Sequence, residues 1–143
     1  MAWQMITSAQ CLKKYGKPEQ EHHMAVFMPA AFSKNTVIPK KIYCNIDLIK
    51  PLQQAFANID KRGLLDEIYE WNGCFNIRNK KAGSTPSLHS WGLAIDINAS
   101  SNGFNKVPTM SKELVQCFKD AGFVWGGDWA TQDGMHFQLA VLP

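Results

Sequence analysis

The 143 residues, of which 45% are hydrophobic and 19% charged, have the composition of one folded globular domain rather than of a disordered or fibrous chain. No apolar run reaches the roughly 18 residues that a membrane span needs, so none is expected. A net charge of +3, without a dense basic stripe or a recognisable motif, argues against a nucleic-acid partner. We therefore expect a single domain over residues 1–143.

Patterns of apolar residues predict three helices in chain order. The first covers 8–15. The clearest runs from about 47 to 60, with its apolar side chains on one face at a spacing of 3.6 residues. The third runs from about 111 to 121 and stops at Gly122.

Strand-like runs lie before and among these helices. Helices mixed with antiparallel-looking strands indicate an α+β domain, with a small antiparallel sheet and packed helices. The adjacent His22 and His23 would face opposite sides of a strand, and we interpret them as surface or edge residues. The predicted strands are 21–28, 73–78, 93–98, 123–126 and 136–142.

The charges are unevenly placed along the chain. Residues 1–81 carry twelve Lys/Arg and seven Asp/Glu, a net +5, whereas residues 82–143 carry three and five, a net −2. A basic half beside an acidic half would suit an anionic polymer as substrate. Short clusters such as Lys80-Lys81 are nevertheless usually solvated surface, and we interpret them in this way.

The four cysteines are scattered, without a C-x-x-C pair or a His at finger-like spacing, so no cysteine metal site is expected. Four cysteines allow two disulfides, but buried free thiols are the simpler interpretation in a reducing compartment. The N-terminus lacks the basic start and long apolar region of a signal peptide, which indicates a cytoplasmic origin. The cysteines are Cys11, Cys44, Cys74 and Cys117.

The alternation of side chains along two predicted strands places one polar side chain of each on the face away from the core. The apolar members of 93–98 share one face, which turns Asp96 toward a cleft on the opposite face. In 136–142 the same alternation puts the apolar side chains, as far as Val141, in the core and His136 on the other face.

Two histidines and one aspartate can meet at a metal ion. His89 precedes the strand that carries Asp96, and Gly92 permits the turn between them. With His136 they form the three protein ligands of a catalytic zinc, which leaves its fourth position to water. Asp133, three residues before His136, is a spare carboxylate suited to be the general base. The pattern predicts metal-assisted hydrolysis in a cleft on the sheet.

This constellation resembles a known family, the zinc peptidases of peptidoglycan, over about residues 64–140. The family includes D-Ala-D-Ala carboxypeptidases and dipeptidases and the L-alanyl-D-glutamate endopeptidases of bacteriophage endolysins. The resemblance implies a hedgehog/DD-peptidase-like fold, with the two histidines and Asp96 as ligands of Zn²⁺. The patterns that carry it are Ser87-x-His89-x6-Asp96 and Asp133-x-x-His136.

Further residues have candidate roles around this site. By the resemblance, Arg78 is a cleft cation, able to pair with a substrate carboxylate or support a developing oxyanion. Ser87 could contact the substrate or cap the turn before His89. Trp129 could form an apolar wall for the peptide, and Asp128 could accept a hydrogen bond from a ligand imidazole.

The resemblance implies hydrolysis of peptidoglycan stem peptides by an L-alanyl-D-glutamate endopeptidase that serves as a phage endolysin in host lysis. The alternative is a D-Ala-D-Ala carboxypeptidase; many of these carry Glu at the place of Asp133, whereas Asp is similar to the phage endopeptidases. Gln138 stands where the family often has Glu. Such an endolysin would be a monomer without a separate cell-wall-binding domain. It would wait in the host cytoplasm for release by a holin, or travel with the virion.

Two other classes remain open. Two histidines and a carboxylate also form the facial triad of non-haem iron oxygenases, which metal analysis would distinguish. A non-catalytic zinc-containing cell-wall-binding module would need a fourth protein ligand, for which His22 and His23 are remote candidates.

Overall fold

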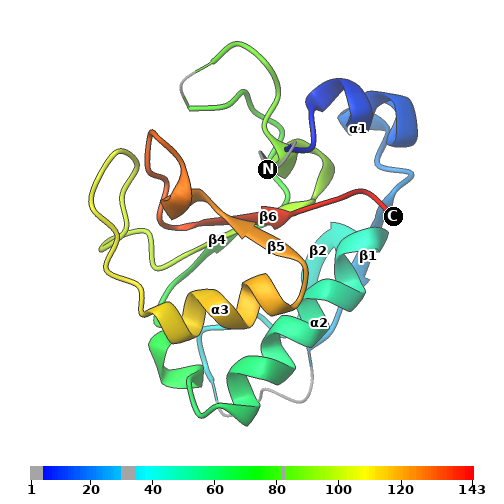
Figure 1. Cartoon of the computed structure of the whole chain (residues 1–143). Helices are drawn as coiled ribbons and strands as arrows, with labels where there is room; N and C mark the ends of the chain where they lie inside the picture. The colour runs from blue at the N-terminus through cyan, green and yellow to red at the C-terminus, as the bar shows by residue number, and fades with distance from the viewer. Residues whose placement is uncertain (1–4, 30–34, 82) are drawn as a thin grey trace.

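Two antiparallel sheets and three helices make up the described part of the chain, residues 5–29, 35–81 and 83–143 of a computed structural model (Figure 1). The first sheet pairs β1 (Met24–Phe27) with β2 (Ile42–Asn45). The second has the order β3-β4-β6-β5, with β3 (Trp71–Gly73), β4 (Ala94–Ile97), β5 (Phe123–Trp125) and β6 (His136–Leu139). The helices are α1 (Ser8–Tyr15), α2 (Ile46–Lys61) and α3 (Lys112–Asp120).

Each helix begins at a polar cap that satisfies a free backbone N–H of its first turn. The side chains of Thr7, Asn45 and Ser111 accept these hydrogen bonds at the starts of α1, α2 and α3. The predicted helices agree with the observed ones to within about one residue at each end, because cap and apolar stripe coincide in the sequence.

The four-stranded sheet separates the core from the site. Figure 1 shows α2 and α3 on the same side of β4, β6 and β5. The ring of Phe137 in β6 stacks on Phe118 of α3 with centroids 4.1 Å apart, and Ile95 and Ile97 of β4 are fully buried. Alternation along the strands sends the neighbouring polar side chains to the opposite face. The prediction of an α+β domain with a small antiparallel sheet is confirmed.

Two predicted strands are wrong: 73–78 shares only Gly73 with the observed strand β3, and 136–142 extends past the observed end of β6. The run 73–78 leaves the sheet after Gly73, and its later residues instead hydrogen-bond to the turn that carries His89, as Asn76 N does to His89 O at 3.0 Å. Strand β6 ends at Leu139, opposite the start of its partner β5 at Phe123, and one further backbone hydrogen bond, from Ala140 N to Gly122 O at 2.9 Å, follows it. Val141, expected in the core, is 61% exposed.

The N-terminal half supports the turn before β4. Gly92 has a left-handed φ of +67°, and a Cβ there would lie 2.7 Å from the backbone nitrogen of Asn45. That nitrogen donates to Gly92 O at 3.0 Å, and the Asn45 side-chain amide donates to Trp91 O at 3.0 Å. Glycine is therefore needed at this position both for its backbone conformation and for the close approach.

Burial shifts the pKa of the buried histidine and that of the buried cysteines in opposite directions. His23, expected at the surface, is only 6% exposed and packs beside the ring of Tyr15, while His22 is exposed as expected. Burial lowers the pKa of His23. All four cysteines are buried free thiols, as predicted, and burial raises the pKa of Cys11 and Cys44 to about 12. No helix of the described residues is long and apolar enough to cross a membrane.

Candidate active site

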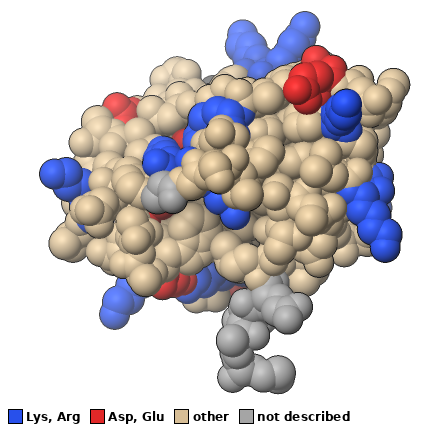
Figure 2. Space-filling view, turned by 90° about the horizontal axis from the view of Figure 1, so that it is seen from above, with Lys and Arg blue, Asp and Glu red and all other residues tan. Residues whose placement is uncertain are grey.

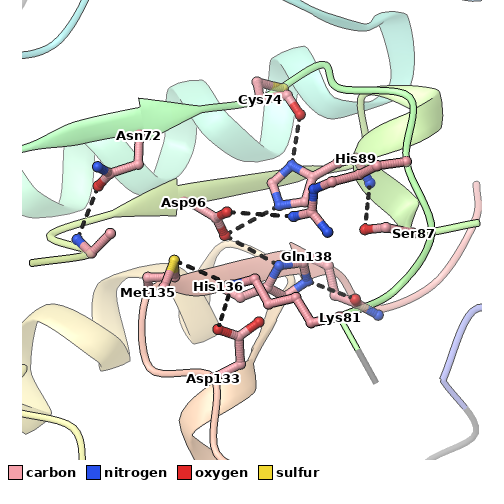
Figure 3. A network of polar contacts seen from close by, with 12 residues as sticks. Asn72, Cys74, Lys81, Ser87, His89, Asp96, Asp133, Met135, His136 and Gln138 are labelled. Carbon is pink, nitrogen blue, oxygen red and sulfur yellow. Dashed lines mark hydrogen bonds and ion pairs between the residues drawn. The ribbon is translucent and has the colours of Figure 1, made fainter. Parts of the chain in front are cut away.

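Three elements bring His89, Asp96 and His136 together. Asp96 in β4 and His136 in β6 are direct partners in the antiparallel register. His89 comes from the 3₁₀ turn Leu88–Trp91 that enters β4. Each residue offers one ligand atom, and the three atoms lie within 4.8 Å of one another (Figure 3). The group has the composition and closeness of a three-ligand metal site.

Acceptors outside this group set the orientation of both imidazole rings. His89 Nδ1 donates to the backbone carbonyl of Cys74 at 2.6 Å, and His136 Nε2 donates to Gln138 Oε1 at 2.9 Å. An oxygen acceptor fixes the proton on the nitrogen that contacts it, so the other nitrogen of a neutral ring carries a lone pair. These lone-pair nitrogens, Nε2 of His89 and Nδ1 of His136, face Asp96 Oδ1 at 3.2 and 3.3 Å.

Asp96 is buried as an anion. Burial alone would raise the pKa of its carboxyl, but contacts with the protonated forms of the His136 and His89 rings outweigh this and hold that pKa well below its usual range. The contacts lie within ion-pair distance without full hydrogen-bond geometry, which leaves His89 Nε2 and Asp96 Oδ1 without a hydrogen-bond partner. Buried donors and acceptors are normally paired. Two nitrogen lone pairs and a carboxylate oxygen that converge in this way fit a metal cation.

Asp133 lies beside this group without joining it. It is almost fully buried, and Lys81 Nζ lies 3.2 Å from its Oδ1. Its backbone is held at both ends, since Asp133 N donates to Gly126 O at 2.9 Å and His136 N donates to Asp133 O at 3.1 Å. These bonds place the carboxylate at the start of the strand that carries His136.

Arg78 and Ser87 flank the turn that carries His89. Arg78 Nη2 lies 3.8 Å from Asp96 Oδ2, and the backbone N–H and C=O of Arg78 bind the hydroxyl of Ser90. Ser87 Oγ accepts from His89 N at 3.3 Å, so its hydroxyl caps this turn, and the residue also lines the cleft. The two alternatives for Ser87 are therefore compatible.

A cleft of about 370 Å³ opens over the site. The ring of Trp129 lies along it, 5.2 Å from that of His136. Asp128 does not accept from a ligand imidazole, contrary to expectation: it is exposed and pairs with Lys119 at 2.7 Å, because the turn of Gly126–Asp128 directs it outward. The cleft is lined by Met5, Ile6, Arg78, Lys80, Lys81, Ser87, Leu88, Phe104, Trp129, Thr131, Asp133, His136 and Gln138.

Two contacts of the site were not expected from the sequence. Lys81, interpreted as solvated surface, reaches into the cleft to Asp133. No pattern signals this, because Lys81 lies in an irregular turn whose direction depends on the fold. Gln138 orients His136, and strand parity could have found this contact, since residues two apart on a strand share a face.

The chain has recognisable similarity to known proteins over part of its length. Residues 80–139, less than half of the chain, match a family described as D-alanyl-D-alanine carboxypeptidase. No curated protein gives a significant match. Among solved structures, the L-Ala D-Glu endopeptidase ChiX of Serratia marcescens matches with 19% identity over 67% of this chain and 80% of that chain, at a TM-score of 0.42. Likeness at this level carries no argument about the site. The segment that resembles this family, residues 80–139, holds the three metal-capable side chains and Asp133.

Proposed function

We propose that this protein is a zinc-dependent peptidase of peptidoglycan that cleaves the L-alanyl-D-glutamate bond of the stem peptide. The observation that carries the proposal is the convergence of His89 Nε2, His136 Nδ1 and Asp96 Oδ1 beside a further buried carboxylate. The family match to residues 80–139 supports a peptidase with this site.

Zinc suits the donor set. Two neutral imidazoles and one carboxylate are protein ligands of catalytic zinc sites, which leave one position open. Among the described residues, no fourth His, Cys, Asp or Glu joins the group, and the buried His23 is not part of it. When bound, zinc supplies a Lewis acid that lowers the pKa of water to about 7 and polarises a carbonyl.

Asp133 is the proposed general base. Its carboxylate accepts the proton of the attacking water and returns it to the leaving amine, so that no net proton is consumed at the side chain. Burial and the two backbone hydrogen bonds fix its position next to His136 without placing it among the ligands. Arg78, beside Asp96, is proposed to bind a substrate carboxylate or the developing oxyanion.

The shape of the cleft supports cleavage of a bond within a peptide rather than at its end. Past Trp129 lies a second pocket of about 510 Å³, which shares Met5 and Trp129 with the first. A peptide could therefore extend beyond the site on this side, as an endopeptidase requires. Trp129 would form the apolar wall between the two pockets.

Removal of terminal D-Ala is the second candidate function. The family description, D-alanyl-D-alanine carboxypeptidase, favours it directly. The same ligands and base would serve, and a cleft cation would bind the terminal carboxylate of the substrate. The two activities differ in the bond that is cut, so their products distinguish them.

The test is digestion of purified peptidoglycan by the zinc-loaded protein, with mass spectrometry of the fragments. Stem peptides that begin at D-Glu, with L-Ala left on the muramyl chain, are expected. Release of D-Ala alone would establish the carboxypeptidase instead. Absence of cleavage, with zinc tightly held, would overturn both and favour a wall-binding module.

The matched control is Asp133→Asn, which keeps the shape of the side chain but cannot accept the proton. Turnover should fall by about 10²–10⁴-fold while zinc remains bound. Loss of zinc from this variant would contradict the role of Asp133, because it would make Asp133 part of the metal site.

A role in host lysis is part of the proposal. Cleavage of stem peptides weakens the wall that resists turgor, so an enzyme with this activity would lyse a cell once it reached the periplasmic side. Expression with and without a membrane-permeabilising protein tests this role: lysis is expected only with both. Lysis without the second protein would contradict release by a holin.

A further inference from the structure

Lys81 enters the cleft from the irregular turn between Arg78 and Ser87. Its ammonium lies 3.2 Å from Asp133 Oδ1 and 3.5 Å from Met135 Sδ, and 5.5 Å from the centroid of the Phe104 ring. Phe104 and Asp133 are bridge partners, so these contacts form one surface under the ammonium. The Lys81 side chain is 29% exposed and that of Asp133 only 8%. The carboxylate is enclosed, whereas the cation opens to the cleft.

The ammonium has more hydrogen-bonding capacity than its partners use. It carries three N–H donors, of which one reaches a carboxylate and another only a thioether, a weak acceptor. Within the described part of the chain, Asp133 is the one anion within ion-pair distance of it. Apolar contacts with Phe104 and Met135 hold the charge at the cleft wall, where a ligand can use the remaining donor.

The charges around the cleft favour an anionic ligand. Arg78, Lys80 and Lys81 line it, against the single lining carboxylate of Asp133. Figure 2 shows more Lys and Arg than Asp and Glu side chains on the face of the molecule seen from above. The guanidinium of Arg78 already lies near Asp96 and donates to Asn79 O, whereas the described oxygen acceptor of the Lys81 ammonium is Asp133.

We infer that Lys81 is a specificity-determining residue, whose ammonium binds a substrate carboxylate next to the scissile amide. The inference rests on the proposed function, because such a carboxylate is present where a D-glutamyl residue is linked through its side chain and keeps its α-carboxylate. When the substrate binds, the Lys81 ammonium stays against Phe104. It then contacts the substrate carboxylate either together with Asp133 or in place of Asp133. A stem peptide whose α-carboxylate is amidated would lose this contact.

The test compares two stem peptides that differ only in this group, a free carboxylate or a carboxamide. Wild type should prefer the acid. Lys81→Met, which keeps the apolar stem, should raise KM for the acid about tenfold, the loss expected for a hydrogen bond to a charged group, and leave KM for the amide unchanged. Lys81→Arg should restore most of the preference. Lys50→Met, on the exposed face of α2, controls for the loss of one charge and should match wild type.

Other outcomes separate the inference from the proposed function. Equal loss on both peptides in Lys81→Met would make Lys81 a positioning residue for Asp133 and overturn the inference. A wild type that cleaves both peptides equally well would also overturn it. If wild type cleaves neither, the proposed function fails; calorimetric binding of the two peptides then decides on Lys81, and equal affinities would reject its role.

Discussion

The imidazoles of the two candidate metal ligands, His89 and His136, are oriented by oxygens that differ in chemical kind. His89 donates to a main-chain carbonyl, that of Cys74, which no substitution removes. His136 donates to the side chain of Gln138. Such outer contacts fix the tautomer and the ring direction of a metal ligand. Substitution of Gln138 therefore tests how the orientation of the His136 ring affects metal binding, without a change to any candidate ligand.

Gln138→Leu should weaken zinc binding about 10–100-fold, because His136 loses the acceptor that keeps Nδ1 free for the metal. Gln138→Glu, which keeps an acceptor oxygen at this place, should bind zinc at least as tightly as wild type. Competition with a chromogenic chelator measures both affinities. Equal affinity of wild type and Gln138→Leu would mean that the ring needs no such support.

Residue patterns anticipated the part of the site that lies on regular structure. Strand parity is a local property, so it could place Asp96 and His136 on one face before any fold was known. Lys81 lies in an irregular turn and Asp128 at the end of a short 3₁₀ turn, and in both places the direction of a side chain depends on tertiary contacts. For this reason the contact of Lys81, an exposed residue as expected, with Asp133 was not predicted, and Asp128 was wrongly expected to be a partner of a metal-binding imidazole.

The short 3₁₀ turn Gly126–Asp128 determines where the candidate base lies. Gly126 O accepts from Asp133 N, and the chains approach so closely that a Cβ on Gly126 would lie 2.3 Å from Asp133 O. Real Cβ contacts are never this short, so a larger residue must push the two segments apart. The loop 126–133 thus couples the end of β5 to the start of β6.

Gly126→Ala should lower turnover and cost about 1–3 kcal/mol of stability, because the added methyl displaces Asp133. Zinc should still bind, since the three ligands lie outside this contact. Gly103→Ala is the control, because its Cβ would meet nothing closer than 3.4 Å. Thermal unfolding, zinc content and peptidase rate are measured on both. Unchanged turnover in Gly126→Ala would show that the position of Asp133 tolerates such a shift.

The helices could be predicted from the sequence more fully than the strands. A cap and a 3.6-residue stripe lie within the helix itself, as Asn45 and Ser111 illustrate. A strand ends where its partner ends, and the partner is remote in sequence. Val141 continues the alternation of β6 but has no neighbour strand, so its apolar character misled the prediction.

The first 60 residues contribute to the site by supporting it. No motif among them indicates a role, yet Asn45 binds the turn that carries His89, and Met5 and Ile6 line the cleft. The metal-capable side chains come from a turn and two strands, and the sheet, this support and hydrogen bonds of the turn to Cys74 and Asn76 hold them in place. A metal ion would link this turn directly to the two strands.

Zinc binding should therefore stabilise the whole domain against unfolding. A ligand that binds only the folded state adds about 2.7 kcal/mol at a free concentration 100 times its dissociation constant, a rise in Tm of several degrees for a domain of this size. Excess chelator should reverse the rise, and added zinc should restore it. Asp96→Asn removes the anionic ligand, so its Tm should respond little to either treatment. A wild-type Tm that ignores both zinc and chelator would mean that His89, Asp96 and His136 do not hold a metal in the folded protein.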